Sequence, residues 1–233
     1  FHSTNCVVSH PTTRIRCSSL SLEHVKRISV ARSGSATAGL CIGIAIGLVA
    51  PASATETTVK PLDLKSTRVF IVGDSLTVGS NPALRKQLKP LVKSVAIDAR
   101  ISRFTGEGIA KLRTARARQA SIWVVGLGTN DSPSAAQTVR NVNKVMRLAG
   151  NTRQVIWVNV VRPGGYSRVN RALQALDAKY PRLSVIDWAA VIRKQRHLLA
   201  GDRVHLTAKG YRVRALATRQ ALLELEDLAD HSS

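Results

Sequence analysis

Cysteine, aromatic residues and acidic residues are all scarce in this chain. Its three cysteines, Cys6, Cys17 and Cys41, lie near the N-terminus. The rest of the chain therefore has no thiol for a disulfide or a metal site, and its folded part depends on a hydrophobic core. Aromatic residues make up only 4% of the chain, which leaves few rings on which bases could stack. The 14 Asp and Glu residues face 35 Lys and Arg, and the formal net charge is +21.

A charge of this size suggests an anionic partner, and the sequence limits which one. The basic residues are spread along the chain, apart from a run from Lys111 to Arg118 that contains no aromatic residue. Because nucleic-acid binding favours basic patches interleaved with aromatic side chains, we expect no nucleic-acid partner. Anionic polymers or lipid headgroups of a cell envelope fit the charge better. The alternative is a surface of solvated arginines with no such partner.

The first 54 residues have the pattern of a targeting segment. Lys26, Arg27 and Arg32 precede an apolar stretch at residues 38–50, and an Ala-Ser-Ala sequence ending at Ala54 follows it. This order is typical of a secretory signal peptide, so we expect cleavage after Ala54 and a secreted or envelope-associated protein. The apolar stretch is shorter than the roughly 20 residues of a spanning helix, so we expect no membrane span in the mature form. An uncleaved membrane anchor is the alternative.

Beyond residue 67, short apolar segments rich in valine and isoleucine alternate with helical patterns. The predicted strands are 68–72, 94–97, 121–125, 154–160 and 183–186, and the predicted helices are 82–91, 106–118, 135–149, 166–179, 189–196 and 207–228. Near-continuous apolar strands are typical of a parallel sheet covered on both faces. We therefore predict a doubly wound, three-layer α/β/α sandwich of flavodoxin-like type, with a mostly parallel five-stranded sheet. It spans residues 68–228, between a polar linker at 55–67 and a polar tail at 229–233.

Ser75 ends the sequence Gly73-Asp74-Ser75, directly after the first predicted strand. The glycine allows a sharp turn, and Ser75 then begins a helical turn whose N–H groups point at a developing negative charge. Ser75 is therefore a candidate nucleophile, and a helix cap is the alternative interpretation. The segment lacks both a Gly-x-Gly-x-x-Gly pattern and a P-loop, so a nucleotide- or flavin-binding domain is disfavoured and no cofactor is expected.

Two further motifs supply the remaining parts of acyl-transfer chemistry. Asn130, in Gly128-Thr129-Asn130-Asp131, follows the third strand and can donate its amide to an oxyanion, although a simple turn would also explain it. Asp202 and His205 lie three residues apart near the C-terminus, so the carboxylate can orient the imidazole as a general base. A metal pair is the weaker interpretation because no third ligand is evident.

In combination and order, these motifs resemble the SGNH (GDSL-type) hydrolase superfamily over residues 68–225. The resemblance implies that Ser75 is the nucleophile, His205 the general base and Asp202 its partner. It also implies that the oxyanion is bound by the Ser75 N–H, the Asn130 amide and a backbone N–H after the second strand. Ser102 occupies the place where the family has a glycine for that last donor.

Within the superfamily, the chain is most similar to the extracellular catalytic domains of peptidoglycan O-acetyltransferases. The similar segments are 98–103, 125–130, 158–162 and Asp187-Trp188. The implied function is a serine acylhydrolase or O-acyltransferase that acts on acyl, above all acetyl, esters of envelope carbohydrate or on small esters. A non-catalytic, basic envelope-binding protein is the alternative. Further candidates for substrate contacts are Asp74, Arg103, Arg162, Tyr166 and Asn170, whose other interpretation is ordinary polar surface.

Overall fold

The computed structural model describes residues 62–230. The expected signal peptide, its cleavage site and residues 231–233 lie outside the described residues. Within residues 62–230, no helix combines the length and the apolar character needed to cross a bilayer.

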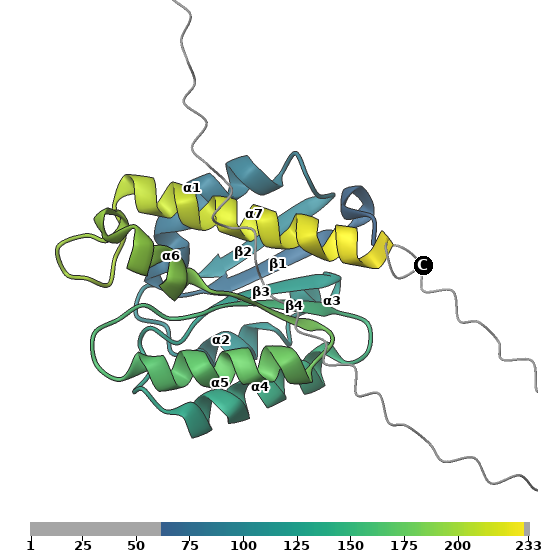
Figure 1. Ribbon diagram of the computed structural model, residues 1–233. Coiled ribbons are helices and arrows are strands. Elements are labelled where there is room, and N and C mark those ends of the chain that lie inside the picture. The colour runs from purple at the N-terminus through teal and green to yellow at the C-terminus, as the bar shows by residue number, and fades with distance from the viewer. Residues whose placement is uncertain (1–61, 231–233) are drawn as a thin grey trace, which may run out of the picture. The chain divides into compact units, whose positions relative to one another are not determined.

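Five parallel strands form one sheet in the order β2-β1-β3-β4-β5 (Figure 1). The strands are β1 (Arg68–Gly73), β2 (Ser94–Ala99), β3 (Ile122–Gly126), β4 (Gln154–Val158) and β5 (Leu183–Ile186). From β1 the chain moves outward to β2 and then returns to β3 on the other side of β1. The strand order therefore reverses between β1 and β3, where doubly wound folds bind their ligands. The predicted fold class is confirmed.

Helices cover both faces of the sheet. They are α1 (Ser75–Leu88), α2 (Thr105–Lys111), α3 (Ala115–Arg118), α4 (Ala135–Ala149), α5 (Tyr166–Lys179), α6 (Trp188–Lys194) and α7 (Ala208–Asp230), with short 3-10 turns η2 (Leu64–Ser66) and η3 (Arg196–Leu198). Figure 1 shows α1, α6 and α7 on one face and α2, α4 and α5 on the other. Successive side chains of β1 point to opposite faces of the sheet. Val69 belongs to the core cluster with α1 and α7, whereas Phe70 belongs to the cluster with α4 and α5.

The largest difference from the predicted elements is the start of α1. The helix begins at Ser75 rather than at Pro82, because Asp74 caps it by accepting the Leu76 N–H at 3.0 Å. Pro82 therefore lies inside the helix, where it removes one backbone donor. Packing of α1 against α7 outweighs this local preference.

Two other boundaries differ for local reasons. The predicted helix at 106–118 is divided into α2 and α3, because Thr114 interrupts it and caps the second part. The predicted strand at 154–160 ends at Val158. Both backbone groups of Val160 are bound by the side chain of Asn170 instead of a neighbouring strand.

The end of the predicted linker packs onto the domain. Leu64, in η2, is 1% exposed and belongs to the core beneath α7. Its N–H donates to Glu226 Oε1 on α7 at 2.9 Å. Residues 62–67 are therefore part of the folded unit.

Gly210 allows the start of α7 to approach η3 closely. A Cβ at this position would lie 2.3 Å from the Leu198 carbonyl oxygen, a backbone atom. We expect Gly210→Ala to lower the free energy of unfolding by about 1–3 kcal/mol through overpacking, measured by urea denaturation. Gly106→Ala is the matched control, because no atom lies within 4 Å of its new Cβ. Equal stability of the two variants would contradict the close approach.

Candidate active site

Ser75 lies at the carboxyl end of β1, in a turn that only glycine permits. A Cβ on Gly73 would meet Thr77 Oγ1 at 1.9 Å. The turn is joined to the next strand by Asp74 N–H, which donates to the Gly126 carbonyl at 3.2 Å. Because Ser75 is the first residue of α1, its N–H has no acceptor within the helix and lies at the positive end of the helix dipole.

A hairpin-like loop before α7 carries Asp202 and His205. Leu199 and Leu206 form an isolated antiparallel bridge, and the Ala200 N–H donates to the His205 carbonyl at 2.8 Å. Asp202 Oδ1 accepts the N–H groups of Val204 at 3.0 Å and of His205 at 2.9 Å. These bonds set the carboxylate and the imidazole side by side.

Ser75, His205 and Asp202 form a continuous hydrogen-bonded series. Ser75 Oγ lies 3.0 Å from His205 Nε2, and His205 Nδ1 lies 2.6 Å from Asp202 Oδ2. The hydrogen bond from His205, together with the two backbone N–H groups, lowers the pKa of Asp202 to about 2. Asp202 is therefore ionised at neutral pH, so Nδ1 carries the proton and Nε2 is left to accept one.

Asn130 and Ser102 lie in the loops that follow β3 and β2, the two neighbours of β1. Asn130 Nδ2 donates to the Arg103 carbonyl at 3.2 Å, which joins the two loops. Ser102 adopts a left-handed backbone with φ 58°. This backbone region favours glycine, so the serine here is held in a conformation that glycine would adopt without strain.

Arg103 ties the β2–α2 loop to the turn formed by residues 73–75. Its side chain is 4% exposed, and Nη1 donates to the carbonyls of Gly73 at 3.3 Å and Asp98 at 2.6 Å. Nη2 forms an ion pair with Asp98 Oδ1 at 2.6 Å. The side chain therefore faces the protein rather than solvent, and it positions the loop that carries Ser102.

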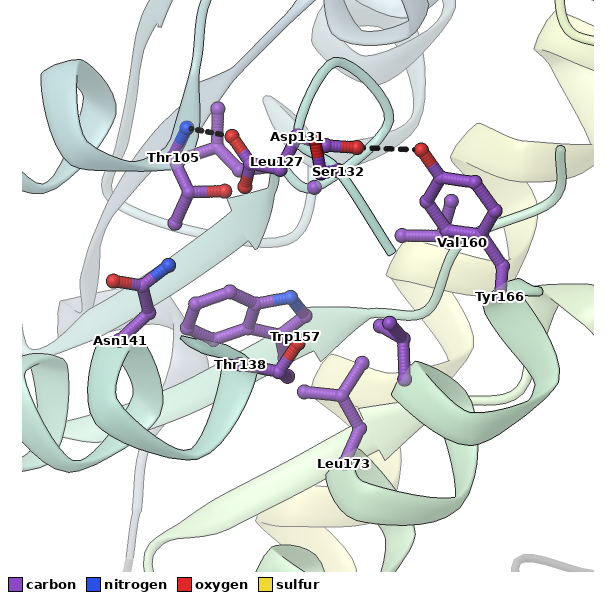
Figure 2. A pocket seen from close by; sticks show the side chains of 12 residues that line it. Thr105, Leu127, Asp131, Ser132, Thr138, Asn141, Trp157, Val160, Tyr166 and Leu173 are labelled. Carbon is purple, nitrogen blue, oxygen red and sulfur yellow. Dashed lines mark hydrogen bonds between the residues drawn. The ribbon is translucent and has the colours of Figure 1, made fainter. Parts of the chain in front are cut away.

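The loop that carries Asn130 is also held on its other side (Figure 2). Asp131 accepts the Thr105 N–H on its carboxylate at 3.0 Å and the Tyr166 hydroxyl on its carbonyl at 2.5 Å. Arg162 Nη1 donates to the Thr129 carbonyl at 2.6 Å. A small cavity lined by Leu127, Trp157 and Tyr166, among others, lies beneath this loop.

The weaker sequence candidates thus have contacts of their own. Asp74, Arg103 and Tyr166 are buried, and Asn170 holds Val160. Arg162 is the exposed member of the group. In this conformation the four others support the loops around Ser75 instead of presenting groups to a substrate.

Sequence reasoning missed Thr129, Arg214, Ile101 and Phe104. Thr129 and Arg214 are buried and both influence Asp74, whereas the two apolar side chains are exposed in the loop that carries Ser102. Arg214 shares the buried face of α7 with Thr218, Ala221 and Leu222. The helical spacing of these four positions is the sequence signal from which the burial of Arg214 could have been predicted. Within residues 62–230, no group of three or more His, Cys, Asp or Glu side chains is arranged to hold a metal ion.

No protein-family model matches the sequence, and no curated protein matches it. Solved structures do match. The C-terminal catalytic domain of peptidoglycan O-acetyltransferase A from Streptococcus pneumoniae, solved with a methylsulfonyl adduct, is 20% identical, with a TM-score of 0.58 over 70% of this chain and 96% of that chain. A family 3 carbohydrate esterase from Talaromyces cellulolyticus is 18% identical, with a TM-score of 0.59 over 69% and 98%. A member of the lipolytic G-D-S-L family from Veillonella parvula is 19% identical, with a TM-score of 0.54 over 66% and 96%. The resemblance inferred from the three motifs is confirmed by these matches, and the chain has the SGNH (GDSL-type) hydrolase fold.

Proposed function

We propose that this protein is a serine acylhydrolase or O-acyltransferase that acts on acyl esters, above all acetyl esters, of cell-envelope carbohydrate. The observation that carries the proposal is the series from Ser75 Oγ through His205 to Asp202, with contacts of 3.0 and 2.6 Å. The similarity to an O-acetyltransferase domain and to carbohydrate esterases supports the class of substrate. The expected signal peptide supports a secreted or envelope-associated location.

In the first half of the reaction, Ser75 Oγ attacks the ester carbonyl while its proton moves to His205 Nε2. Asp202 stabilises the imidazolium through Nδ1. The Ser75 N–H, the Ser102 N–H and Asn130 Nδ2 bind the negative oxygen of the tetrahedral intermediate. The intermediate collapses to an acyl-Ser75 ester, and the alcohol leaves with the proton from Nε2.

The second half reverses these roles. His205 Nε2 removes a proton from water or from a sugar hydroxyl, which attacks the acyl carbonyl and releases Ser75 with its proton restored. Water gives hydrolysis, whereas a sugar hydroxyl gives acyl transfer.

The rim of the site offers contacts for a carbohydrate ester. Ile101 and Phe104 are 66% and 54% exposed and flank Ser102 and Arg103 in one loop. Apolar side chains at this place fit the apolar face of a sugar ring or a short acyl group. Arg162 is an exposed residue whose Nη1 donates to the Thr129 carbonyl, and its other N–H groups can bind an anionic or hydroxyl group beside the Asn130 loop.

The proposal is tested by p-nitrophenol release from p-nitrophenyl acetate by the purified protein. We expect Ser75→Ala to lose at least about 10³-fold in kcat, because the nucleophile is removed. Ser167→Ala, at an exposed position on α5, is the control. Phenylmethylsulfonyl fluoride is expected to add one sulfonyl group to the wild type, seen by intact mass, and none to Ser75→Ala. Folded wild-type protein that neither turns over nor labels would favour the envelope-binding alternative.

Asp202 is expected to act as a permanent charge during turnover. Since its pKa is lowered to about 2, the stabilisation it contributes is complete above its ordinary value of 3.8 and is lost as the pH falls through about 2. Above its ordinary pKa, Asp202 should therefore add no ionisation of its own to the pH profile of kcat/KM. We expect Asp202→Asn to lower kcat by about 10²- to 10⁴-fold at every pH of that profile. Asp63→Asn is the control, since Asn caps η2 as well as Asp does. Unchanged turnover in Asp202→Asn would show that His205 needs no carboxylate.

Arg103 is expected to position the oxyanion donors. We expect Arg103→Met to lower kcat by about 10²-fold, because the loop with Ser102 and the acceptor of Asn130 would shift. The measurement is kcat and KM on p-nitrophenyl acetate. Arg100→Met is the matched control: Arg100 lies in the same loop, but its ion pair with Glu107 is exposed. A rise in KM with unchanged kcat would instead assign Arg103 to substrate binding.

A further inference from the structure

Arg214 is a charged side chain buried close to the turn at residues 73–75, here named the nucleophile turn after the proposed role of Ser75. It comes from α7 and is 4% exposed. Its Nη2 lies 2.9 Å from the position that a Cβ on Gly126 would occupy. Gly126 is the residue whose carbonyl accepts the Asp74 N–H, so the guanidinium reaches the junction between the ends of β1 and β3.

Asp74 is the acidic counterpart at this junction, with 0% exposure. One carboxylate oxygen accepts the Leu76 N–H. Three other polar atoms, Asp74 Oδ2, Thr77 Oγ1 and Arg214 Nε, are buried and have no hydrogen-bond partner among the described residues. Polar atoms in such an environment interact strongly with nearby charges, because little water screens them.

The two charges compensate each other's burial. Burial raises the pKa of Asp74, and the positive charge of Arg214, the Leu76 N–H and the Thr129 side chain oppose that rise. Burial lowers the pKa of Arg214, and Asp74 and Tyr211 oppose that change. The other charged groups nearby have partners of their own: Arg103 pairs with Asp98, and His205 binds Asp202.

We propose that Arg214 is a positioning residue for Ser75: its buried guanidinium provides the counter-charge to Asp74, and the pair holds the nucleophile turn against the end of β3. This inference rests on the proposed acyl-transfer function. Asp74 bonds to both α1 and Gly126, and Thr129 lies one residue before Asn130. A shift of the Asp74 side chain would therefore displace both the nucleophile, Ser75, and the oxyanion donor, Asn130.

A purely structural role for Arg214, filling space under α1, makes a different prediction. A space-filling side chain would be replaced by methionine at a cost that is independent of pH and of Asp74. If Arg214 is a counter-charge, the cost of the methionine depends on pH and on Asp74, because an unpaired buried carboxylate is stabilised by protonation. The pH dependence and the coupling to Asp74 therefore separate the two roles.

The test uses Arg214→Met, Asp74→Asn and the double variant, with Arg212→Met as the matched control. Arg212 lies on the same helix and is exposed. We expect Arg214→Met to lower kcat on p-nitrophenyl acetate by about 10- to 100-fold with little change in KM. Its acid limb should move to higher pH, because Asp74 then binds a proton more readily. The double variant should recover part of the lost kcat and lack that shift, since no buried charge remains unpaired.

Urea unfolding of the same variants, followed by tryptophan fluorescence, gives a readout independent of activity. Arg214→Met should unfold at a lower urea concentration than the wild type. The difference should be largest at neutral pH and shrink as the pH falls, because a protonated Asp74 needs no counter-charge. In the double variant the difference should not change with pH. If the wild type lacks esterase activity, the proposed function fails, and this cycle still reports whether the two residues act as a pair.

Each outcome decides the proposal. It is overturned if Arg214→Met matches Arg212→Met in kcat and pH profile, or if the losses of the two single variants simply add in the double variant. If Arg214→Met does not fold, Arg214→Lys, which retains the charge, takes its place. A lysine variant with a wild-type acid limb and a folded double variant would support the pair. A lysine variant as impaired as Asp74→Asn, or an unfolded double variant, would overturn it.

Discussion

The parallel pairing of β1 with β3 is the constraint on which the rest of the site depends. Their register aligns Gly73 with Gly126, so both strands end at the same level of the sheet. The chain leaves β1 toward one layer of helices and β3 toward the other, and the crevice between them opens at this point. That register brings the strand ends that precede Ser75 and Asn130 to one level of the sheet, although the two residues lie far apart in the chain.

Five of the 14 acidic residues act as hydrogen-bond acceptors in the segments that follow the strands or precede α7. Asp74 caps α1, Asp98 binds Arg103, Asp131 binds Thr105, Asp187 caps α6 and Asp202 binds His205. Each carboxylate fixes a loop or a helix start by accepting an N–H that would otherwise be unsatisfied. A strongly basic protein can in this way keep a precisely ordered edge, because its few carboxylates are used there as structural acceptors.

The loops around Ser75 are held as a connected set. Arg103 joins the β2–α2 loop to Gly73, Asn130 joins the β3–α4 loop to Arg103, and Tyr166 joins that loop to α5. A site built this way is preorganised, and electrostatic stabilisation of an oxyanion depends on donors that do not reorganise during the reaction. Fold similarity at 13–20% identity shows the architecture; chemistry at this site depends on these contacts.

The sequence by itself determined the fold class, most element boundaries to within two residues, and the identity of the three motifs. Apolar periodicity identifies α4, α5 and β5 to the residue, because their patterns are local. It did not determine the start of α1, where tertiary packing outweighs a run of weak helix formers and an internal proline. Only the tertiary structure decided that Arg103 and Asp74 are buried supports rather than surface groups, and that the buried Arg214 reaches Gly126 at the end of β3. Those roles depend on which loops meet across the sheet, and the proximity of two side chains 140 positions apart, such as Asp74 and Arg214, leaves no periodic trace in the chain.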